Sequence, residues 1–217
     1  MLTIQTFIFN PFSENTYVVF DETLEAVVID PGCYEPEEEN ELDNFINQKG
    51  LRIKYVLNTH CHIDHVLGNF HVKEKYKVPL LIHSIEEQVL RAVKVYAPTY
   101  GFSAYREALP DQFLVEGEHV TFGKTTWSIL FLPGHSPGHI AFYDEKENKI
   151  FSGDVLFERS IGRTDLPGGN FETLKDSIQK KLFALPDAVV VYSGHGNTTT
   201  LGEEKISNPY CALSIRA

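Results

Sequence analysis

Four residues of metal-ligand type directly follow a short apolar segment of the chain. Residues 54–58 predict a buried strand, and the sequence THCHIDH follows it at once. In an extended segment the side chains of His60 and His62 project to the same side. A turn into a helix then brings Asp64 and His65 toward the same cavity. Neutral imidazole and carboxylate are natural protein ligands of zinc or iron, so this pattern predicts a metal cavity at the end of a strand.

Three further potential ligands lie beside glycines near predicted strands. His135 lies in LPGHSPGH, Asp154 in FSGD and His195 in VYSGHG. Ligands and catalytic groups commonly collect in such loops. The alternative for the first motif is a set of solvated histidines, but with nine histidines in the chain a chance match is on the order of one in a thousand. The motifs together supply seven potential metal ligands: His60, His62, Asp64, His65, His135, Asp154 and His195.

The rest of the chain predicts one α/β domain over residues 1–217. Two blocks of strands, each accompanied by helices, favour two sheets packed face to face with helices outside. The predicted strands are 3–9, 16–20, 26–29, 54–58, 78–82, 127–132, 139–143, 149–152 and 188–192, with short strands near Phe113 and Val120. The predicted helices are 37–49, 64–76, one that starts in a capping box at Ser84, 171–183 and one from 202 onward. Residues 97–112 predict a long loop.

Charge and cysteine content narrow the classes of function. The formal net charge of −11 disfavours a nucleic-acid partner, because nucleic-acid binding depends on Lys and Arg. Acidic residues gather between positions 35 and 43, where we expect a solvated helix face. No apolar run approaches the ~20 residues of a membrane span. Three cysteines without a C-x-x-C pair, and an N-terminus without signal-peptide features, favour a cytoplasmic protein. We expect a small-molecule substrate and no membrane partner; the oligomeric state stays open.

The motifs HxHxDH, PGH, GD and GH, in this order, resemble those of the metallo-β-lactamase-fold hydrolases. With GRTD at 162–165 and YSGHGNTTT at 192–200, the chain is most similar to the small glyoxalase II-like (hydroxyacylglutathione hydrolase-like) enzymes. The resemblance implies a four-layer αββα sandwich with metal ions at one edge of the two sheets. It implies a first metal held by His60, His62 and His135, a second held by Asp64, His65 and His195, and Asp154 bridging the two.

The resemblance also implies a reaction. Two zinc ions, with iron or manganese as alternatives, lower the pKa of a shared water molecule toward ~7, so that hydroxide is available to attack a thioester carbonyl. The substrate class would be S-acylglutathione or another small thioester. Asp64 is the candidate catalytic residue, because its carboxylate can orient the nucleophile or accept its proton.

The substrate-binding residues of true glyoxalase II match this chain only in part. Arg163 occupies the basic position of the substrate loop, where it can bind a carboxylate or pair with Asp165. The loop tyrosine is replaced near Asp165, and the tyrosine of a second loop is replaced by Asn197. The family's helical C-terminal domain has no counterpart. These differences weigh against tight glutathione recognition. Four aromatic residues predict either a substrate mouth or, slightly favoured, a hydrophobic cluster under a loop: Tyr96, Tyr100, Phe102 and Tyr105.

Two other functions compete with the hydrolase. A persulfide dioxygenase of the same fold shares THCHxDH and GRTD, and uses one iron at the positions of His60, His135 and Asp154. Its last histidine lies in a PAHD context, whereas His195 lies in SGHG. The second alternative is a non-enzymatic metal-binding domain, which the complete ligand set disfavours. A β-lactamase is disfavoured by GRTD and by the absence of a secretion signal.

Overall fold

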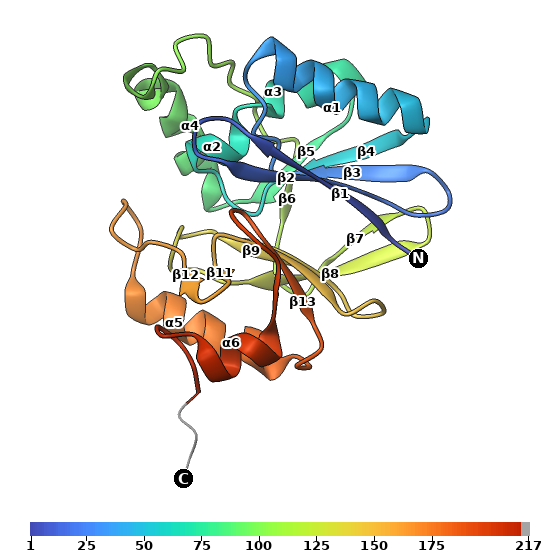
Figure 1. Cartoon of the computed structure of the whole chain (residues 1–217). Helices are drawn as coiled ribbons and strands as arrows, with labels where there is room; N and C mark the ends of the chain where they lie inside the picture. The colour runs from blue at the N-terminus through green and yellow to red at the C-terminus, as the bar shows by residue number, and fades with distance from the viewer. Residues whose placement is uncertain (214–217) are drawn as a thin grey trace.

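The computed structural model describes residues 1–213, and residues 214–217 lie outside the described part. Two six-stranded sheets face each other, with helices on both outer faces (Figure 1). The predicted four-layer αββα sandwich is therefore confirmed. The extent of the predicted single domain, 1–217, stays a prediction.

The first sheet consists of the strands of the N-terminal half, in the spatial order of the sequence. Its first three strands pair antiparallel, and the remaining pairs are parallel. The loops that leave the C-terminal ends of the central parallel strands therefore meet at one edge of the sheet. The strands are β1 (Thr3–Phe9), β2 (Glu14–Phe20), β3 (Glu25–Ile29), β4 (Arg52–Leu57), β5 (Leu80–His83) and β6 (Gln112–Leu114).

The second sheet has the order β14-β13-β10-β9-β8-β7, in which β10 and β13 pair parallel. Its strands are β7 (His119–Phe122), β8 (Thr125–Phe131), β9 (Ile140–Asp144), β10 (Lys149–Gly153), β13 (Val190–Ser193) and β14 (Thr199–Thr200). A separate small hairpin pairs β11 (Leu156–Phe157) with β12 (Ser160–Ile161). The sequence analysis did not predict β11, β12 or β14, because two-residue strands carry too little periodicity.

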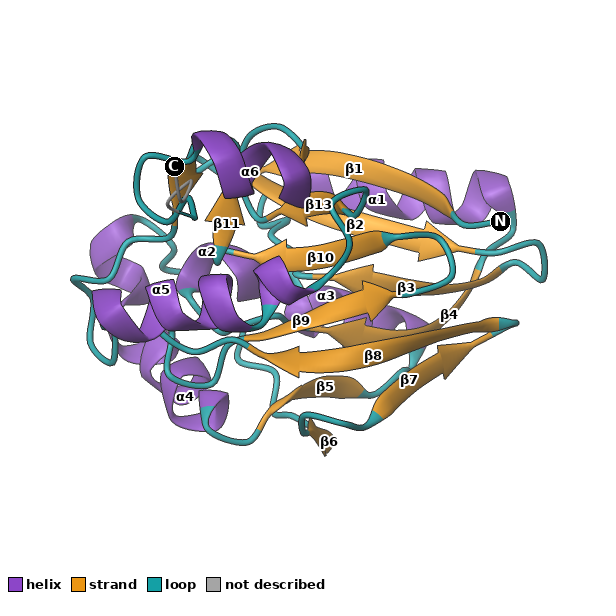
Figure 2. Ribbon diagram, turned by 90° about the horizontal axis from the view of Figure 1, so that it is seen from below, coloured by secondary structure: helices purple, strands orange, loops and turns teal. Residues whose placement is uncertain are grey.

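Helices cover the outer face of each sheet. On the first sheet lie α1 (Pro36–Lys49), α2 (Ile63–Val66), α3 (Asn69–Tyr76), α4 (Glu86–Tyr96) and the 3₁₀ turn η1 (Ala97–Tyr100). On the second lie α5 (Phe171–Lys180), the turn η2 (Leu182–Ala184) and α6 (Leu201–Ser207). Figure 2 shows α5 and α6 in front of β9, β10 and β13. Among residues 1–213, no helix combines the length and apolar character needed to cross a membrane.

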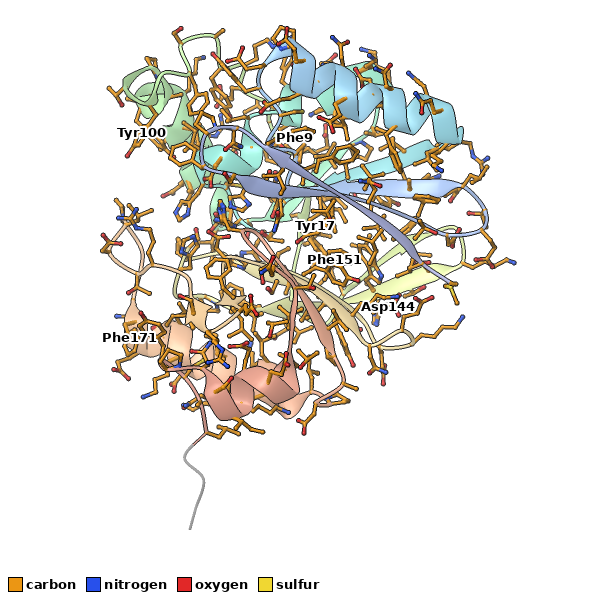
Figure 3. All side chains as sticks on the ribbon, viewed as in Figure 1. Phe9, Tyr17, Tyr100, Asp144, Phe151 and Phe171 are labelled. Atoms are coloured by element: carbon orange, nitrogen blue, oxygen red, sulfur yellow. The ribbon has the colours of Figure 1, made fainter. Side chains whose placement is uncertain are left out.

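Three apolar cores hold the four layers together. Tyr17 and Phe151 meet between the sheets, with ring centroids 5.3 Å apart (Figure 3). Phe9 packs with the helices on the other face of the first sheet, and Leu174 of α5 packs on the outer face of the second. Since both faces of β2 are covered, every residue from Glu14 to Phe20 is buried. This packing fixes the sheet edge at which the loops converge.

Two local predictions are wrong. The predicted helix 64–76 is two helices, α2 and α3, separated at Leu67 and Gly68, where the Gly68 amide donates to the Pro31 carbonyl oxygen (2.8 Å) of another segment. The capping box at Ser84 does not form: the N-cap of α4 is Ile85, and no side chain caps the helix there. The side chain of Glu86 instead accepts hydrogen bonds from two distant loops.

The acidic segment 35–43 is only partly a solvated helix face. Glu38 accepts hydrogen bonds from the backbone amides of Asn10 and Tyr34. Asp43 is buried and accepts from Lys75 and from the Tyr76 hydroxyl. The segment therefore attaches α1 to the first layer in addition to carrying charge.

Candidate metal centre

The seven predicted ligands gather at one edge of the sandwich. His60 and His62 follow β4, Asp64 and His65 lie in α2, and His135 lies in the loop between β8 and β9; Asp154 follows β10, and His195 follows β13. The fold therefore brings together all seven residues, which span positions 60 to 195. Two of the groups of side chains that could hold a metal ion are His60, His62 and His135, and Asp64, His65 and His195.

The first triad is built from three converging imidazole rings. His135 Nε2 lies 3.2 Å from His60 Nε2 and 2.8 Å from His62 Nδ1. Burial lowers the pKa of His62 to about 3, and the neighbouring His135 adds to the effect. Burial likewise lowers the pKa of His60 and of His135. All three rings are therefore neutral near pH 7 and present nitrogen lone pairs.

The second triad is surrounded by carboxylates. Asp64 Oδ2 lies 3.1 Å from His195 Nε2 and 3.5 Å from His65 Nε2. Burial acts to lower the pKa of His65, but Asp64 and Asp154 outweigh it and hold that pKa well above its usual range. The carboxylates therefore favour a positive charge beside them. This pocket is therefore built to receive positive charge.

Asp154 lies between the two triads. Its Oδ1 is 3.4 Å from His65 Nε2, and its Oδ2 is 3.5 Å from His135 Nε2 and 3.6 Å from His195 Nε2. Burial acts to raise the pKa of this carboxyl group, but the interaction with His65, above all, lowers the pKa overall. One carboxylate thus faces both triads, as the predicted bridging role requires.

The ligand rings are oriented by hydrogen bonds at their other nitrogen atoms. His135 Nδ1 donates to the Arg163 carbonyl oxygen (2.7 Å), and His195 Nδ1 donates to the Ser13 carbonyl oxygen (3.2 Å). His65 Nδ1 donates to Asp30 Oδ2 (3.2 Å). Such partners fix the ring orientation and leave the second nitrogen free to bind a metal.

The donor atoms fit a pair of cations. Imidazole nitrogens that share one zinc ion at about 2.0–2.1 Å lie about 3.3 Å apart in tetrahedral geometry, close to the spacing of the first triad. His65 Nε2 and Asp154 Oδ1 are buried and make no hydrogen bond, although they lie 3.4 Å apart. Bound cations would satisfy both atoms, which otherwise carry a desolvation cost. The individual ligand assignments remain predictions.

The three predicted substrate residues lie on the surface near this centre. The Arg163 guanidinium makes a bidentate ion pair with Asp165, at 2.7 and 2.8 Å. Both side chains are exposed, by 62% and 68%, so the pair is accessible to a substrate. Asn197 donates to Glu158 Oε2 at 3.0 Å. The backbone of Arg163 contacts a predicted ligand, since its carbonyl oxygen accepts from His135 Nδ1.

Asp30 supports the centre but was not predicted from the sequence. Its carboxylate accepts from the Thr59 amide (2.7 Å), the Thr59 hydroxyl (2.6 Å) and His65. It therefore holds the start of the ligand loop and one ligand ring. In the sequence, Asp30-Pro31-Gly32 indicates only a turn. The remaining sequence signal was its position directly after an apolar strand, the same context as Asp154.

The other interpreted side chains divide between core and rim. Cys61 is buried, and His139 is a buried histidine whose Nε2 accepts from the Asp154 amide. Phe102, Tyr96 and Tyr105 belong to the hydrophobic cluster under the helices, as the favoured alternative predicted. Tyr100, labelled in Figure 3, differs because it is 56% exposed. Its ring centroid lies 6.2 Å from that of Phe12.

The sequence profile of the metallo-beta-lactamase superfamily matches residues 9–195. The chain belongs to this superfamily. Its matched segment contains all seven predicted ligands, from His60 to His195.

Among similar proteins, the chain is 38% identical over 201 residues to the hydroxyacylglutathione hydrolase GloC of Haemophilus influenzae, covering 92% of this chain and 93% of that protein. It is 31% identical over 204 residues to the mitochondrial persulfide dioxygenase ETHE1 of Bos taurus, covering 92% and 72%. Both families named in the sequence analysis are therefore relatives. The superfamily match and the similarity to GloC together support a metal-dependent hydrolase as the broad class of function.

Solved structures agree with this fold. The crystal structure of BLEG-1 B3 metallo-beta-lactamase aligns with a TM-score of 0.87 and 34% identity, covering 97% of this chain and all of that one. The structure of TTHA1623 in a di-iron-bound form aligns with a TM-score of 0.85 and 37% identity, covering 95% and 99%. Similar folds thus carry names of different activities, so the substrate must be argued from the site.

Proposed function

We propose that this protein is a binuclear metal-dependent hydrolase of small thioesters, similar to glyoxalase II. The observation that carries the proposal is the pair of complete ligand triads with Asp154 between them. The match to a protein named hydroxyacylglutathione hydrolase supports the thioester as substrate class. Zinc is the proposed metal, since neutral imidazoles and carboxylates with open coordination positions suit a catalytic zinc site.

The bound cations would supply a water molecule of lowered pKa and polarise the thioester carbonyl. The chain's own residues position this chemistry. Asp154 faces both triads and keeps them close together. Asp64 lies beside His65 and His195, and burial acts to raise its pKa, but the charge of His65 lowers it overall. Asp64 is therefore ionised near neutral pH, and we assign its carboxylate the role of accepting a proton from the nucleophile.

A mononuclear iron persulfide dioxygenase is the second candidate. The specific observation in its favour is that His135 Nε2 lies 3.2 Å from His60 Nε2 and 3.5 Å from Asp154 Oδ2, so these three residues alone can form one site. Because the persulfide dioxygenases share THCHxDH, the residues of the second triad do not separate the two candidates. The SGHG context of His195, which differs from the PAHD context of the dioxygenases, favours the hydrolase instead.

The rim of the site supports a small substrate with an apolar part. Phe12 and Tyr100 are exposed by 41% and 56%, and Phe12 adjoins Ser13, whose carbonyl binds His195. Arg163 offers a cation, but Asp165 neutralises much of it. We therefore propose a small thioester without a strict requirement for the two carboxylates of glutathione, and propose neither nucleic acid nor membrane as partner.

The test is a parallel assay of the metal-loaded protein. Thiol release from S-lactoylglutathione and from a neutral acyl thioester is measured beside oxygen uptake with glutathione persulfide. The proposal expects thiol release with kcat/KM of at least about 10⁴ M⁻¹s⁻¹ for one thioester. Oxygen uptake without thioester hydrolysis would overturn it in favour of the dioxygenase.

A further inference from the structure

A fully buried carboxylate outside the ligand set lies where α4 begins. Glu86 has 0% exposure, and its Oε2 accepts a hydrogen bond from the Cys61 amide at 2.7 Å. Its Oε1 accepts from the Ser136 hydroxyl at 2.6 Å and from the Gly138 amide at 2.7 Å. These donors come from two loops that are far apart in the sequence. One carboxylate thus connects both loops.

Each of these loops carries ligands of the first triad. Cys61 lies between His60 and His62, and Ser136 directly follows His135. In an extended segment, residues two apart project to the same side, so His60 and His62 share one face and the backbone of Cys61 joins them. The bond from the Cys61 amide to Glu86 therefore fixes the backbone that carries both histidines. The two bonds at Oε1 fix the turn that presents His135.

The hydrogen bonds make this buried charge sensitive to the position of the loops. Burial raises the pKa of Glu86, whereas the bonds from Ser136, Cys61 and Gly138 favour the ionised form. A buried carboxylate left without its donors carries a desolvation penalty. Displacement of either loop would break at least one of these bonds. Because Glu86 is the first residue of α4, its negative charge also interacts favourably with the helix dipole.

The loop that carries Gly138 packs closely against Glu86 at the start of α4. A Cβ at Gly138 would lie 2.9 Å from Glu86 Cγ and 2.9 Å from its backbone nitrogen, so the loop approaches α4 closely only because position 138 is glycine. A backbone bond from the Ile140 amide to the Thr59 carbonyl oxygen (2.8 Å) joins the same two loops elsewhere. Glu86 thus adds side-chain bonds to a junction that links the two sheets.

We infer that Glu86 is a positioning residue for the first triad, holding His60 and His62 at the distance from His135 that one metal ion needs. None of its three hydrogen bonds involves Asp64, His65 or His195. The rings of the second triad are instead oriented by Asp30 and by the Ser13 carbonyl. Loss of the Glu86 bonds therefore weakens one metal site and spares the other. This inference rests on the metal centre of the proposed function and is independent of its substrate.

The test compares Glu86→Gln with Glu87→Gln in the full-length protein. Glutamine offers one acceptor and one donor end, so it cannot serve donors on both sides of the carboxylate. Glu87 lies next to it, on the outer side of α4, where it pairs with Arg91, so its variant controls for the change of charge. The readout is zinc bound per chain against a competing chelator, together with urea unfolding of the metal-free proteins.

We expect wild type and Glu87→Gln to hold about two zinc ions under conditions where Glu86→Gln holds about one. The weakened site should lose affinity by about 10–100-fold. Equal retention of both ions by Glu86→Gln would overturn the inference. Parallel loss of both, in proportion to lost folding stability, would also overturn it, because that is the result of a merely structural residue.

Ser136→Ala provides a milder variant if Glu86→Gln does not fold. It removes one donor and leaves the carboxylate and both amide bonds in place. We expect the same single site to weaken by up to about tenfold. Unchanged binding at both sites in Ser136→Ala would contradict the inference. A wild-type chain that binds no zinc, iron or manganese would overturn the proposed function instead, which keeps the two failures distinguishable.

Discussion

His62 Nδ1 lies 2.8 Å from His135 Nε2, although the two residues are 73 positions apart in the chain. One ring comes from the loop after the first sheet's β4, and the other from the loop between β8 and β9 of the second sheet. The first triad therefore exists only when the two sheets are packed together. The second triad also draws on both sheets. Asp64 and His65 come from the first sheet's side, and His195 follows β13 of the second sheet.

Removal of His62 should empty the first metal site. We expect His62→Ala to retain about one metal ion per chain and to lower kcat/KM for the best thioester at least about 100-fold, equivalent to about 2.7 kcal/mol. Metal analysis and steady-state kinetics measure both quantities. His119→Ala is the control, because His119 is an exposed residue of β7. Full turnover by His62→Ala would refute its assignment as a ligand.

Asp154 should matter to both sites at once. Its carboxylate lies within 3.6 Å of ligand nitrogens in both triads. Asp154→Asn keeps the size of the side chain but removes the negative charge that two cations share. We expect bound metal to fall below one ion per chain in a competition with chelator that leaves the wild type with about two. Selective loss of a single ion would argue against the bridging role.

Asp165 should restrain Arg163 from binding anionic substrates. The hydrogen bonds from Arg163 lower the pKa of Asp165 to about 2, so the pair is ionised throughout the neutral range. Exposed ion pairs are weak, so release of Arg163 by Asp165→Asn should lower KM for acidic thioesters modestly, about 1.5–5-fold. KM for neutral thioesters should not change. Arg163→Ala should raise KM for the acidic thioesters selectively, and equal effects on both classes would indicate a structural role.

Asp43 should make stability depend on pH in the acid range. Burial acts to raise its pKa, but hydrogen bonds from Lys75 and Tyr76 outweigh burial and lower the pKa overall. The folded-state pKa is thus below the unfolded value near ~3.9, so the unfolded chain binds more protons as the pH falls. The stability that Asp43 contributes is complete above that value and is lost as the pH falls through the folded pKa.

Urea unfolding of the metal-free protein across pH 7 to pH 3 measures this contribution. We expect the free energy of unfolding of Asp43→Asn to fall less steeply in acid than that of the wild type. Glu41→Gln, an exposed position on the same helix, should follow the wild type. Parallel curves for wild type and Asp43→Asn would show that the carboxylate contributes no pH-linked stability.

Much of the fold could be predicted, because the sequence patterns that mark its strands and helix ends are local. Buried strands such as 26–29 follow from apolar runs in the sequence. The end of α1 follows from Gly50, which adopts the left-handed conformation that commonly ends a helix. The break in the predicted helix 64–76 could not be predicted, because it depends on the hydrogen bond from the Gly68 amide to Pro31 of another segment. Contacts of that kind are set by tertiary packing.

The ligand motifs could be predicted because their residues and spacings are unusual. Histidine and aspartate at short fixed spacings are rare, so His60 to His65 stood out without any knowledge of packing. Asp30 and Glu86 did not, because a single acidic residue in a turn or at a helix start has common structural explanations. Only the three-dimensional arrangement shows that Asp30 binds a ligand ring, and that Glu86 spans two ligand loops.

The most direct test of the central claim is elemental analysis of the protein expressed with zinc, iron and manganese all available. The two triads and the shared Asp154 predict about two metal ions per chain, with zinc as the main metal. About one iron per chain with little zinc would contradict the binuclear hydrolase and support the dioxygenase.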